Sequence, residues 1–330
     1  MSGHFERRKK SKGKLTVGFN YRYIATFTRL KELLKEGGIG TVTSVDFHWY
    51  LNTSHGADYF RRWHALRQYS GTLLVHKATH HFDLLNWMID SEPAEVFAYG
   101  GLEHYGKNNS FRHTHCRGCP HTSQCRFYWD ITKSQGYMDL YVANEKYDGY
   151  LRDGCVWRNE IDIYDKMGVL IKYANNVQVT YSLTTYSPFE GWHIAFNGTN
   201  GRIEAWEDIP WLDKVEASQE QLHALQMSQE LEKDVEKFNQ IIRMRNFDKH
   251  EEILVPRFRR GHGGADPLLQ NRIFRQPDAP DPLAHAAGSR DGAMSILIGI
   301  AARKSIDEKR PVKIADLTDL KPQAVRPKNA

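Results

Sequence analysis

The segment at residues 160–207 limits the possible folds more than any other part of the chain, because it is a succession of short β patterns joined by turns. Asn175 and Asn176 mark one turn, and residues 197–201 (NGTNG) mark another. Within 177–186, apolar and polar residues alternate, which is typical of a strand with one covered face. Strands separated by such short turns usually pair antiparallel. The segment therefore predicts a large, open and mostly antiparallel sheet with helices on one face.

Helical patterns lie mostly outside this segment. Residues 26–36 carry Leu30, Leu33 and Leu34 at helical spacing, and Gly37 ends the pattern. We expect further helices at 71–89, 216–245 and 293–305, and further strands at 14–20, 41–51, 94–99 and 311–314. Because strands and helices are partly segregated along the chain, the expected class is α+β around an open sheet.

The composition is that of a folded protein without membrane-spanning segments. Hydrophobic residues make up 40% of the chain and aromatic residues 12%, which is enough for a sizeable core. No apolar run approaches the ~20 residues that a spanning helix needs. The polar N-terminus also lacks the apolar centre of a secretory signal. We therefore expect a cytoplasmic protein with no membrane partner.

The net charge of +5 comes largely from a basic run near the N-terminus. Such a run can contact nucleic acid or a membrane, or it can form a solvated tail. No aromatic interleaving and no known nucleic-acid module accompany it. We therefore expect residues 1–13 to be a disordered tail and expect no nucleic-acid partner. Residues 318–330, which contain Pro322 and Pro327, are also expected to form a tail.

A glycine cluster is the nearest candidate for a nucleotide-binding loop. It consists of Gly37, Gly38 and Gly40, which follow a helical pattern and precede a strand pattern. A Rossmann loop needs the reverse order, so that the phosphate meets the N-terminus of a helix. We therefore predict no cofactor-binding residues and no complete Rossmann domain in this sequence.

All four cysteines fall within one polar, His- and Gly-rich region at about 108–155. They are Cys116, Cys119, Cys125 and Cys155. A C-x2-C pair with two further thiolates can complete a tetrahedral site, so structural Zn²⁺ is the first interpretation. An iron–sulfur cluster, disulfides and unpaired buried thiols are the alternatives. A reducing compartment disfavours disulfides, and nearby histidines could replace one cysteine: His113, His115 and His121.

The pattern at 71–89 places three polar residues on one face of an otherwise apolar helix. His76, His80 and Asp83 are at i, i+4 and i+7. Two imidazoles one turn apart can exchange a proton with one substrate atom, Asp83 can hold His80, and Lys77 can reach a substrate oxygen. The spacing also suits a metal, although no Glu follows His76 as in zincins. A packed, hydrogen-bonded interface is the remaining interpretation.

Several segments together resemble the Gfo/Idh/MocA oxidoreductases. The resemblance rests on residues 17–23 (VGFNYRY), 36–42 (EGGIGTV), 71–83 (GTLLVHKATHHFD), 196–204 (FNGTNGRIE), 291–306 and 311–314. Members of this family join an N-terminal Rossmann domain, which binds NAD or NADP, to an α/β domain with a large open sheet. They oxidise or reduce a hydroxyl of a sugar, inositol or related compound, and the outer sheet face often mediates oligomers.

The resemblance implies a domain plan. Residues 14–23 would be the last strand of a Rossmann domain whose remainder is missing, and 24–317 would be the substrate and oligomerisation domain with the Cys-rich insertion. The intact family enzyme uses NAD(P), so we expect the isolated chain to be inactive as a dehydrogenase. A homo-oligomer formed through the open sheet is also expected.

The resemblance further implies site residues. His80 matches the catalytic histidine of the family, whereas His76 stands where an aspartate is frequent, so His80 would be the acid/base with His76 and Lys77 assisting. Six residues would shape a polyol pocket: Asn20, Arg22, Tyr23, Arg62, Trp63 and His64. The alternatives are a non-enzymatic sugar-binding or oligomerisation module, and part of a nicotinamide-dependent glycosidase-like protein.

Overall fold

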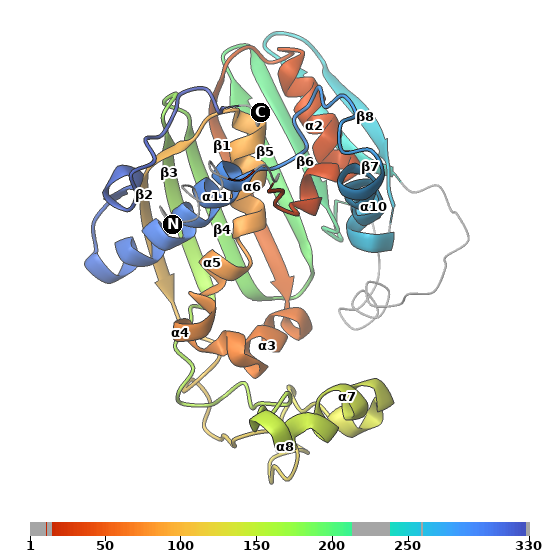
Figure 1. The fold of residues 1–330 in the computed structure, drawn as a ribbon, viewed down its shortest axis with the longest axis vertical. Coiled ribbons are helices and arrows are strands. Elements are labelled where there is room, and N and C mark those ends of the chain that lie inside the picture. The colour runs from red at the N-terminus through yellow and green to blue at the C-terminus, as the bar shows by residue number, and fades with distance from the viewer. Residues whose placement is uncertain (1–10, 12–14, 213–237, 259, 328–330) are drawn as a thin grey trace.

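A nine-stranded sheet forms the centre of the molecule (Figure 1). The structure, a computed structural model, describes residues 11, 15–212, 238–258 and 260–327. The strand order is β8-β7-β6-β5-β1-β4-β3-β2-β9. The strands are β1 (Val42–Asn52), β2 (Pro93–Gly101), β3 (Lys166–Tyr173), β4 (Gln178–Ser187), β5 (Gly191–Gly198), β6 (Gly201–Glu207), β7 (Phe238–Arg245), β8 (His250–Pro256) and β9 (Val312–Lys313).

The pairing in this sheet is mostly antiparallel, as the turn-rich segment predicts. Among the described strands, only β1 and β4 pair in parallel, with Phe47 opposite Tyr181. On its other side β1 pairs antiparallel with β5, where Phe47 lies opposite Ile194. The α+β class and the predominantly antiparallel sheet are therefore confirmed.

Helices cover one face of the sheet. Figure 1 shows α2, α6 and α11 in front of the strands. The longer helices are α2 (Ala25–Lys35), α3 (Thr53–Arg61), α6 (Thr79–Ile89), α10 (Arg260–Gln270) and α11 (Ser289–Glu308). The shorter ones are α4 (Arg67–Ser70), α5 (Leu73–His76), α7 (Gln135–Leu140) and α8 (Glu145–Asp148), with 3-10 turns η1 (Asn20–Tyr23), η2 (Trp63–Ala65), η3 (Ile131–Lys133), η4 (Val142–Asn144) and η6 (Ile314–Asp316) and a π turn η5 (Asn271–Arg275). None of the helices in the described ranges is long and apolar enough to cross a membrane.

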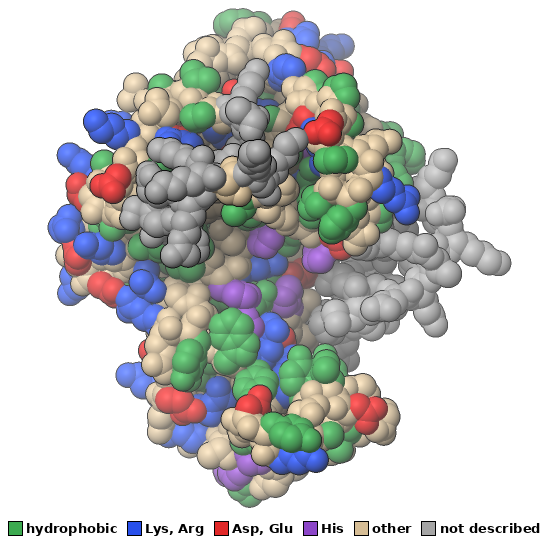
Figure 2. Space-filling view, viewed as in Figure 1, with side chains coloured by type: hydrophobic (Ala, Val, Ile, Leu, Met, Phe, Trp, Pro, Cys, Tyr) green, Lys and Arg blue, Asp and Glu red, His purple; other side chains and the backbone are tan. Residues whose placement is uncertain are grey.

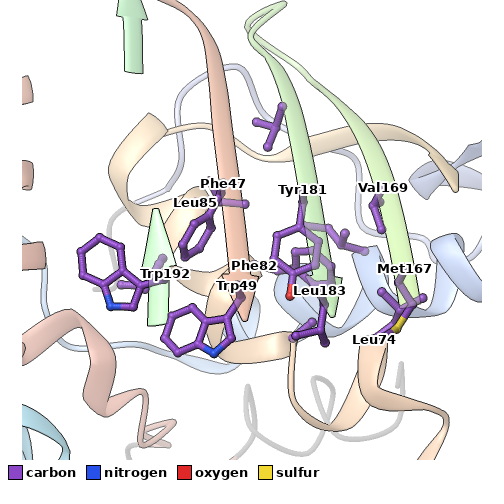
Figure 3. Close-up of a cluster of buried hydrophobic side chains, with 14 of the residues drawn as sticks. Phe47, Trp49, Leu74, Phe82, Leu85, Met167, Val169, Tyr181, Leu183 and Trp192 are labelled. Atoms are coloured by element: carbon purple, nitrogen blue, oxygen red, sulfur yellow. The ribbon is translucent and has the colours of Figure 1, made fainter. Parts of the chain in front are cut away.

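The alternation of the strands decides which side chains form the core. In β3, Met167, Val169 and Ile171 are buried, while Leu170 between them is exposed on the opposite face. Figure 3 shows the buried side packing against the helices, with side chains from strands and helices in one cluster: Phe47, Trp49, Leu74, Phe82, Leu85, Met167, Val169, Tyr181, Leu183 and Trp192. Each fully buried apolar side chain of this size stabilises the fold by roughly 1.5–3 kcal/mol. Self-association through the uncovered face stays a prediction.

Two elements of the structure, one at the start and one in the middle of the chain, differ from those that the sequence predicts. In place of a strand at 14–20, the described residues form only an isolated antiparallel bridge between Val17 and Ala287, followed by η1. The helix expected at 216–245 lies partly outside the described residues, and its end is the strand β7. Ile241 of β7 pairs with Ala205 of β6 and with Ile253 of β8, so sheet pairing outweighs the local helical preference.

A tail was expected at each end of the chain. The basic run at 1–13 lies outside the described residues except for Ser11. At the other end, residues 318–327 form no helix or strand and are mostly exposed, but the Arg326 side chain is 4% exposed and its Nη1 donates to Asp291 Oδ1 at 2.6 Å. A buried ion pair fixes this segment, which the two prolines alone did not indicate.

The Cys-rich insertion forms a lobe between β2 and β3 that contains α7 and α8, seen at the bottom of Figure 1. Helix α3 joins the lobe to the sheet. Gly56 of α3 lies so close to β4 that a Cβ there would come 1.6 Å from the carbonyl oxygen of Thr185. This close approach requires glycine and places the end of α3, with Arg61 and Arg62, between the sheet and the lobe.

Candidate functional site

The histidine segment is two short helices rather than the one continuous helix predicted at 71–89. Helix α5 ends at His76 and α6 begins at Thr79. Between them the amide of Ala78 donates to the carbonyl of Leu73 at 2.8 Å, a five-residue span that widens the turn. His76 and His80 therefore project from separate helices, with Lys77 at the junction.

Contrary to the prediction, Asp83 does not bond to His80. Its Oδ2 accepts from Arg22 Nε at 2.7 Å and its Oδ1 accepts from Arg22 Nη2 at 2.6 Å. Arg22 is 0% exposed, and its Nη2 also lies 3.3 Å from Asp291 Oδ1. A completely buried guanidinium that is paired in this way cannot line a pocket, so the structure places Arg22 in the core instead of among the substrate ligands.

His64 and His76 form a direct pair. Their Nε2 atoms lie 2.9 Å apart, so one ring donates a proton and the other accepts it. Burial lowers the pKa of His64 to about 3 and that of His76 to about 4, with Arg62 adding to both effects. Both rings are therefore uncharged at neutral pH. Trp63, which is 43% exposed, stacks on His64 with ring centroids 3.7 Å apart.

His80 is a partly exposed, uncharged imidazole. Burial lowers its pKa to about 4, and Lys77 contributes to the same shift. Its Nδ1 is buried without a hydrogen-bond partner, and its Nε2 bonds to none of the described residues. The rings of Phe19 and Tyr21 flank it at centroid distances of 5.6 and 5.2 Å. A neutral imidazole in this state can accept a proton over the whole physiological pH range.

Lys77 lies beside His80. Its Nζ donates to the hydroxyl of Tyr21 at 3.1 Å and lies 5.7 and 5.5 Å from the ring centroids of Tyr21 and Trp49. Burial disfavours the ammonium, but Tyr21, Tyr59 and Glu190 outweigh that effect and hold the pKa of Lys77 above the usual lysine value. The group is a fixed cation next to a proton acceptor.

The remaining predicted substrate residues lie in three places. Arg62 and Trp63 lie with His64 near His76, and Arg62 Nε bonds to Asp58 Oδ2 at 3.0 Å.

Asn20 donates to Asp266 Oδ1 at 2.9 Å, and Asp266 also binds His262, whose ring lies near Tyr21. Tyr23 instead stacks on His285 at 5.0 Å, with its hydroxyl buried and a pKa that burial raises to about 12. No described contact joins it to His80.

Sequence reasoning missed the aromatic walls of the site. Tyr21, Trp49 and Tyr59 are 9%, 7% and 6% exposed, and they border the His76, Lys77 and His80 group. Tyr21 lies in the 17–23 segment that carries the family resemblance, so its position could have drawn attention to it. Trp49 and Tyr59 look like ordinary core residues of a strand and a helix. Figure 2 shows histidine side chains gathered in a hollow between the main body and the lobe.

The four cysteines line one small cavity in the lobe, together with His113 and His115. None of them forms a disulfide. Cys116 Sγ accepts from Arg61 Nη1 at 3.2 Å, Cys155 Sγ from the amide of Trp157 at 3.4 Å, and Cys119 Sγ from the amide of His121 at 3.5 Å. Within the described ranges, however, no three or more His, Cys, Asp or Glu side chains are grouped so as to hold a metal ion. The predicted zinc site is therefore not supported by this arrangement, although its four cysteines are brought together.

Comparison with protein families gives one match that spans most of the chain. Residues 31–314 match the family model described as "Oxidoreductase family, C-terminal alpha/beta domain", of the Gfo/Idh/MocA group. The Bacillus subtilis (strain 168) protein YteT, named as an oxidoreductase, is 36% identical over 330 residues, covering 94% of this chain and 72% of YteT.

Solved structures share the fold at low sequence identity. A levoglucosan dehydrogenase in complex with NADH and levoglucosan superposes with a TM-score of 0.56 at 15% identity, over 92% of this chain and 67% of the enzyme. The transcriptional regulator Gal80p from Kluyveromyces lactis gives a TM-score of 0.56 at 12% identity, over 94% of this chain and 64% of Gal80p. The same fold thus serves a dehydrogenase and a regulator.

Proposed function

Because the chain belongs to the Gfo/Idh/MocA family of oxidoreductases, we propose that it provides the substrate-binding and proton-transfer side of an NAD(P)-dependent oxidoreductase that acts on a sugar, inositol or related polyol. The observation that carries this proposal is the uncharged imidazole of His80 beside the Lys77 ammonium, between aromatic side chains. Aromatic faces suit the apolar side of a sugar ring, and polar side chains suit its hydroxyls.

The roles of the residues follow from their charge states. During oxidation of a secondary alcohol, His80 Nε2 accepts the hydroxyl proton, and in the reverse direction it returns that proton to the carbonyl oxygen. Lys77 stabilises the oxygen as negative charge develops on it, because its ammonium is held in place by Tyr21. The nicotinamide, when bound, supplies or accepts the hydride.

Sugar binding at His80 tests this proposal. We expect a panel of sugars and inositols, followed by NMR, to include ligands that shift the imidazole resonance of His80, which is assigned by its disappearance in His80→Gln. The resonance of His250, which is exposed on β8, serves as the control and should not move. Ligands that bind without moving the His80 resonance, or an absence of binding across the panel, would contradict the proposal.

A non-enzymatic role is the second candidate. The likeness to Gal80p shows that the fold does not by itself require catalysis. Under this alternative the chain binds a sugar in the same hollow and passes the signal to a partner protein. His80→Gln separates the two candidates. An enzyme that contains this chain should lose substrate turnover in this variant, whereas a sensor should retain its response to the sugar.

We also propose that Cys116, Cys119, Cys125 and Cys155 take up structural Zn²⁺. All four line the same cavity, and three of their sulfurs accept N–H hydrogen bonds. Burial raises the pKa of the Cys155 thiol, so a metal would have to displace its proton. Metal binding would draw the sulfurs toward the centre of the cavity. Arg61 contacts Cys116 and immediately precedes Arg62, Trp63 and His64, so the metal would also stabilise one wall of the substrate site.

Metal analysis and chelation test the zinc proposal. We expect about one zinc per chain, and we expect chelation to lower the melting temperature by roughly 2–4 °C for each kcal/mol of stability lost. Cys116→Ser should remove the metal, whereas Ser110→Ala, an exposed change in the same lobe, should not. Purified protein without bound zinc, and with a melting temperature that neither added zinc nor chelator changes, would show that the cavity is a cluster of unpaired thiols.

A further inference from the structure

Among the residues that the structure describes, the Lys77 ammonium forms no ion pair with a carboxylate. Its hydrogen bond goes to the Tyr21 hydroxyl, and no carboxylate of the described residues lies within ion-pair distance of its Nζ. The rings of Tyr21 and Trp49 attract the cation, but they leave its net charge in place. A half-buried charge without a counter-ion is costly, so its presence at a pocket indicates a ligand that completes the balance.

The nearby carboxylates are already engaged. Glu190 lies within electrostatic reach of Lys77, but its Oε1 contacts His55 Nδ1 at 2.9 Å and its Oε2 accepts from the amide of Asn52 at 2.8 Å. Asp58 is shared between two guanidinium groups, those of Arg62 and Arg152.

Around the His64–His76 pair and Lys77, the cations outnumber the carboxylates by one. Three cations act on the histidine group, namely Lys77, Arg62 and Arg152, against two carboxylates, Asp58 and Glu190. The histidines themselves are uncharged at neutral pH. Arg152 also keeps two buried N–H donors, Nε and Nη1, without hydrogen-bond partners, while its guanidinium lies over the rings of Trp129, Tyr137 and Tyr141.

We propose that the ligand of this site is an acidic sugar, a uronic or aldonic acid, whose carboxylate pairs with Lys77. This inference rests on the proposed function, because it names the substrate class of the same site. A carboxylate carries one negative charge and matches the single uncompensated cation, whereas a sugar phosphate carries nearly two. The sugar ring then lies against the Tyr21 and Trp49 side of the hollow, with a hydroxyl directed at His80. The Lys77 ammonium carries several N–H donors, so it can pair with the carboxylate and still face the oxygen of that hydroxyl.

Competition between matched sugars tests the inference. Galacturonate and galactose, and glucuronate and glucose, differ mainly at one carbon, and glucose 6-phosphate adds the phosphate. In equilibrium titrations of the 330-residue chain at pH 7, followed by tryptophan fluorescence and by the His80 resonance, we expect the carboxylates to bind about tenfold to a hundredfold more tightly than the neutral sugars. Added salt should reduce this preference, since the pair is partly exposed to solvent.

Variants at Lys77 assign the preference to one side chain. Lys77→Met should abolish the preference for carboxylates, Lys77→Arg should retain most of it, and Lys172→Met, on the exposed face of the sheet, should leave it unchanged. Urea unfolding of each variant confirms that the fold is intact. Neutral sugars that bind at His80 as tightly as their acids, tighter binding of the phosphate, or a preference that survives in Lys77→Met would overturn the inference and leave the proposed function standing. Failure of every sugar to affect His80 would overturn both.

Discussion

Replacement of Asp83 by asparagine should lower the free energy of unfolding by about 3–5 kcal/mol. The change leaves Asp291, at 3.3 Å, as the acidic partner of the buried Arg22 guanidinium among the described residues, and Asp291 also pairs with Arg326. Arg22 is 0% exposed and Asp83 is 1% exposed, so water cannot replace the lost carboxylate oxygen. Urea unfolding measures the effect as a lower midpoint at an unchanged m-value.

A double variant separates loss of charge from loss of packing. Arg22→Met combined with Asp83→Leu removes both charges and keeps apolar volume, so we expect it to be less destabilised than Asp83→Asn alone. Asp319→Asn, an exposed change near the C-terminus, should stay within about 0.5 kcal/mol of the native protein. An Asp83→Asn protein that is within 1 kcal/mol of native stability would contradict the interpretation of Arg22 and Asp83 as a buried structural pair.

Acid should destabilise the protein between pH 6.5 and about 4, because the buried histidines resist protonation. Burial lowers the pKa of His64 to about 3 and those of His76 and His80 to about 4, whereas unfolded histidine titrates near pH 6.5. Within this window the unfolded chain binds more protons than the folded one, so a fall in pH favours unfolding. For His80 alone the expected loss across the window is on the order of 2–3 kcal/mol.

Unfolding free energies measured at several pH values check this expectation. His80→Gln should flatten the dependence on pH by removing one titrating group, and the exposed His250→Gln should not. At pH 7 the folded and unfolded forms of His80 are both mostly uncharged, so a stability difference between native protein and His80→Gln there reports packing alone. Equal slopes for the native protein and His80→Gln would show that this imidazole titrates normally in the folded state.

Local patterns were sufficient for much of the fold. The leucines at 30, 33 and 34 predicted α2, and the alternation at 177–186 predicted β4, because both depend on which face of a single element is covered. The helix expected at 216–245 was wrong where it is described, since Ile241 belongs to a strand paired on both sides. Such pairing depends on residues far away in the sequence, which local propensity does not register.

The candidate site was predictable in part. The pattern at 71–89 indicated a site at His76 and His80, and the sequence spacing located the Cys-rich insertion. The same pattern misassigned Asp83, and the family resemblance misassigned Arg22, because a carboxylate one turn beyond a histidine gives no indication of a guanidinium 61 residues earlier in the chain. The contact between Lys77 and Tyr21, 56 residues apart, was equally invisible.

The sequence by itself determined that the helices and strands each have one apolar face and that these faces pack together on an open sheet, since an apolar face has to be buried against another element. It also determined which titratable side chains share the histidine segment. Only the tertiary structure decided that β1 lies between β4 and β5, that Asp83 neutralises Arg22, and that Lys77 bonds to the hydroxyl of Tyr21. Charge balance depends on every group that packs around an atom, and those groups come from segments that the sequence leaves far apart.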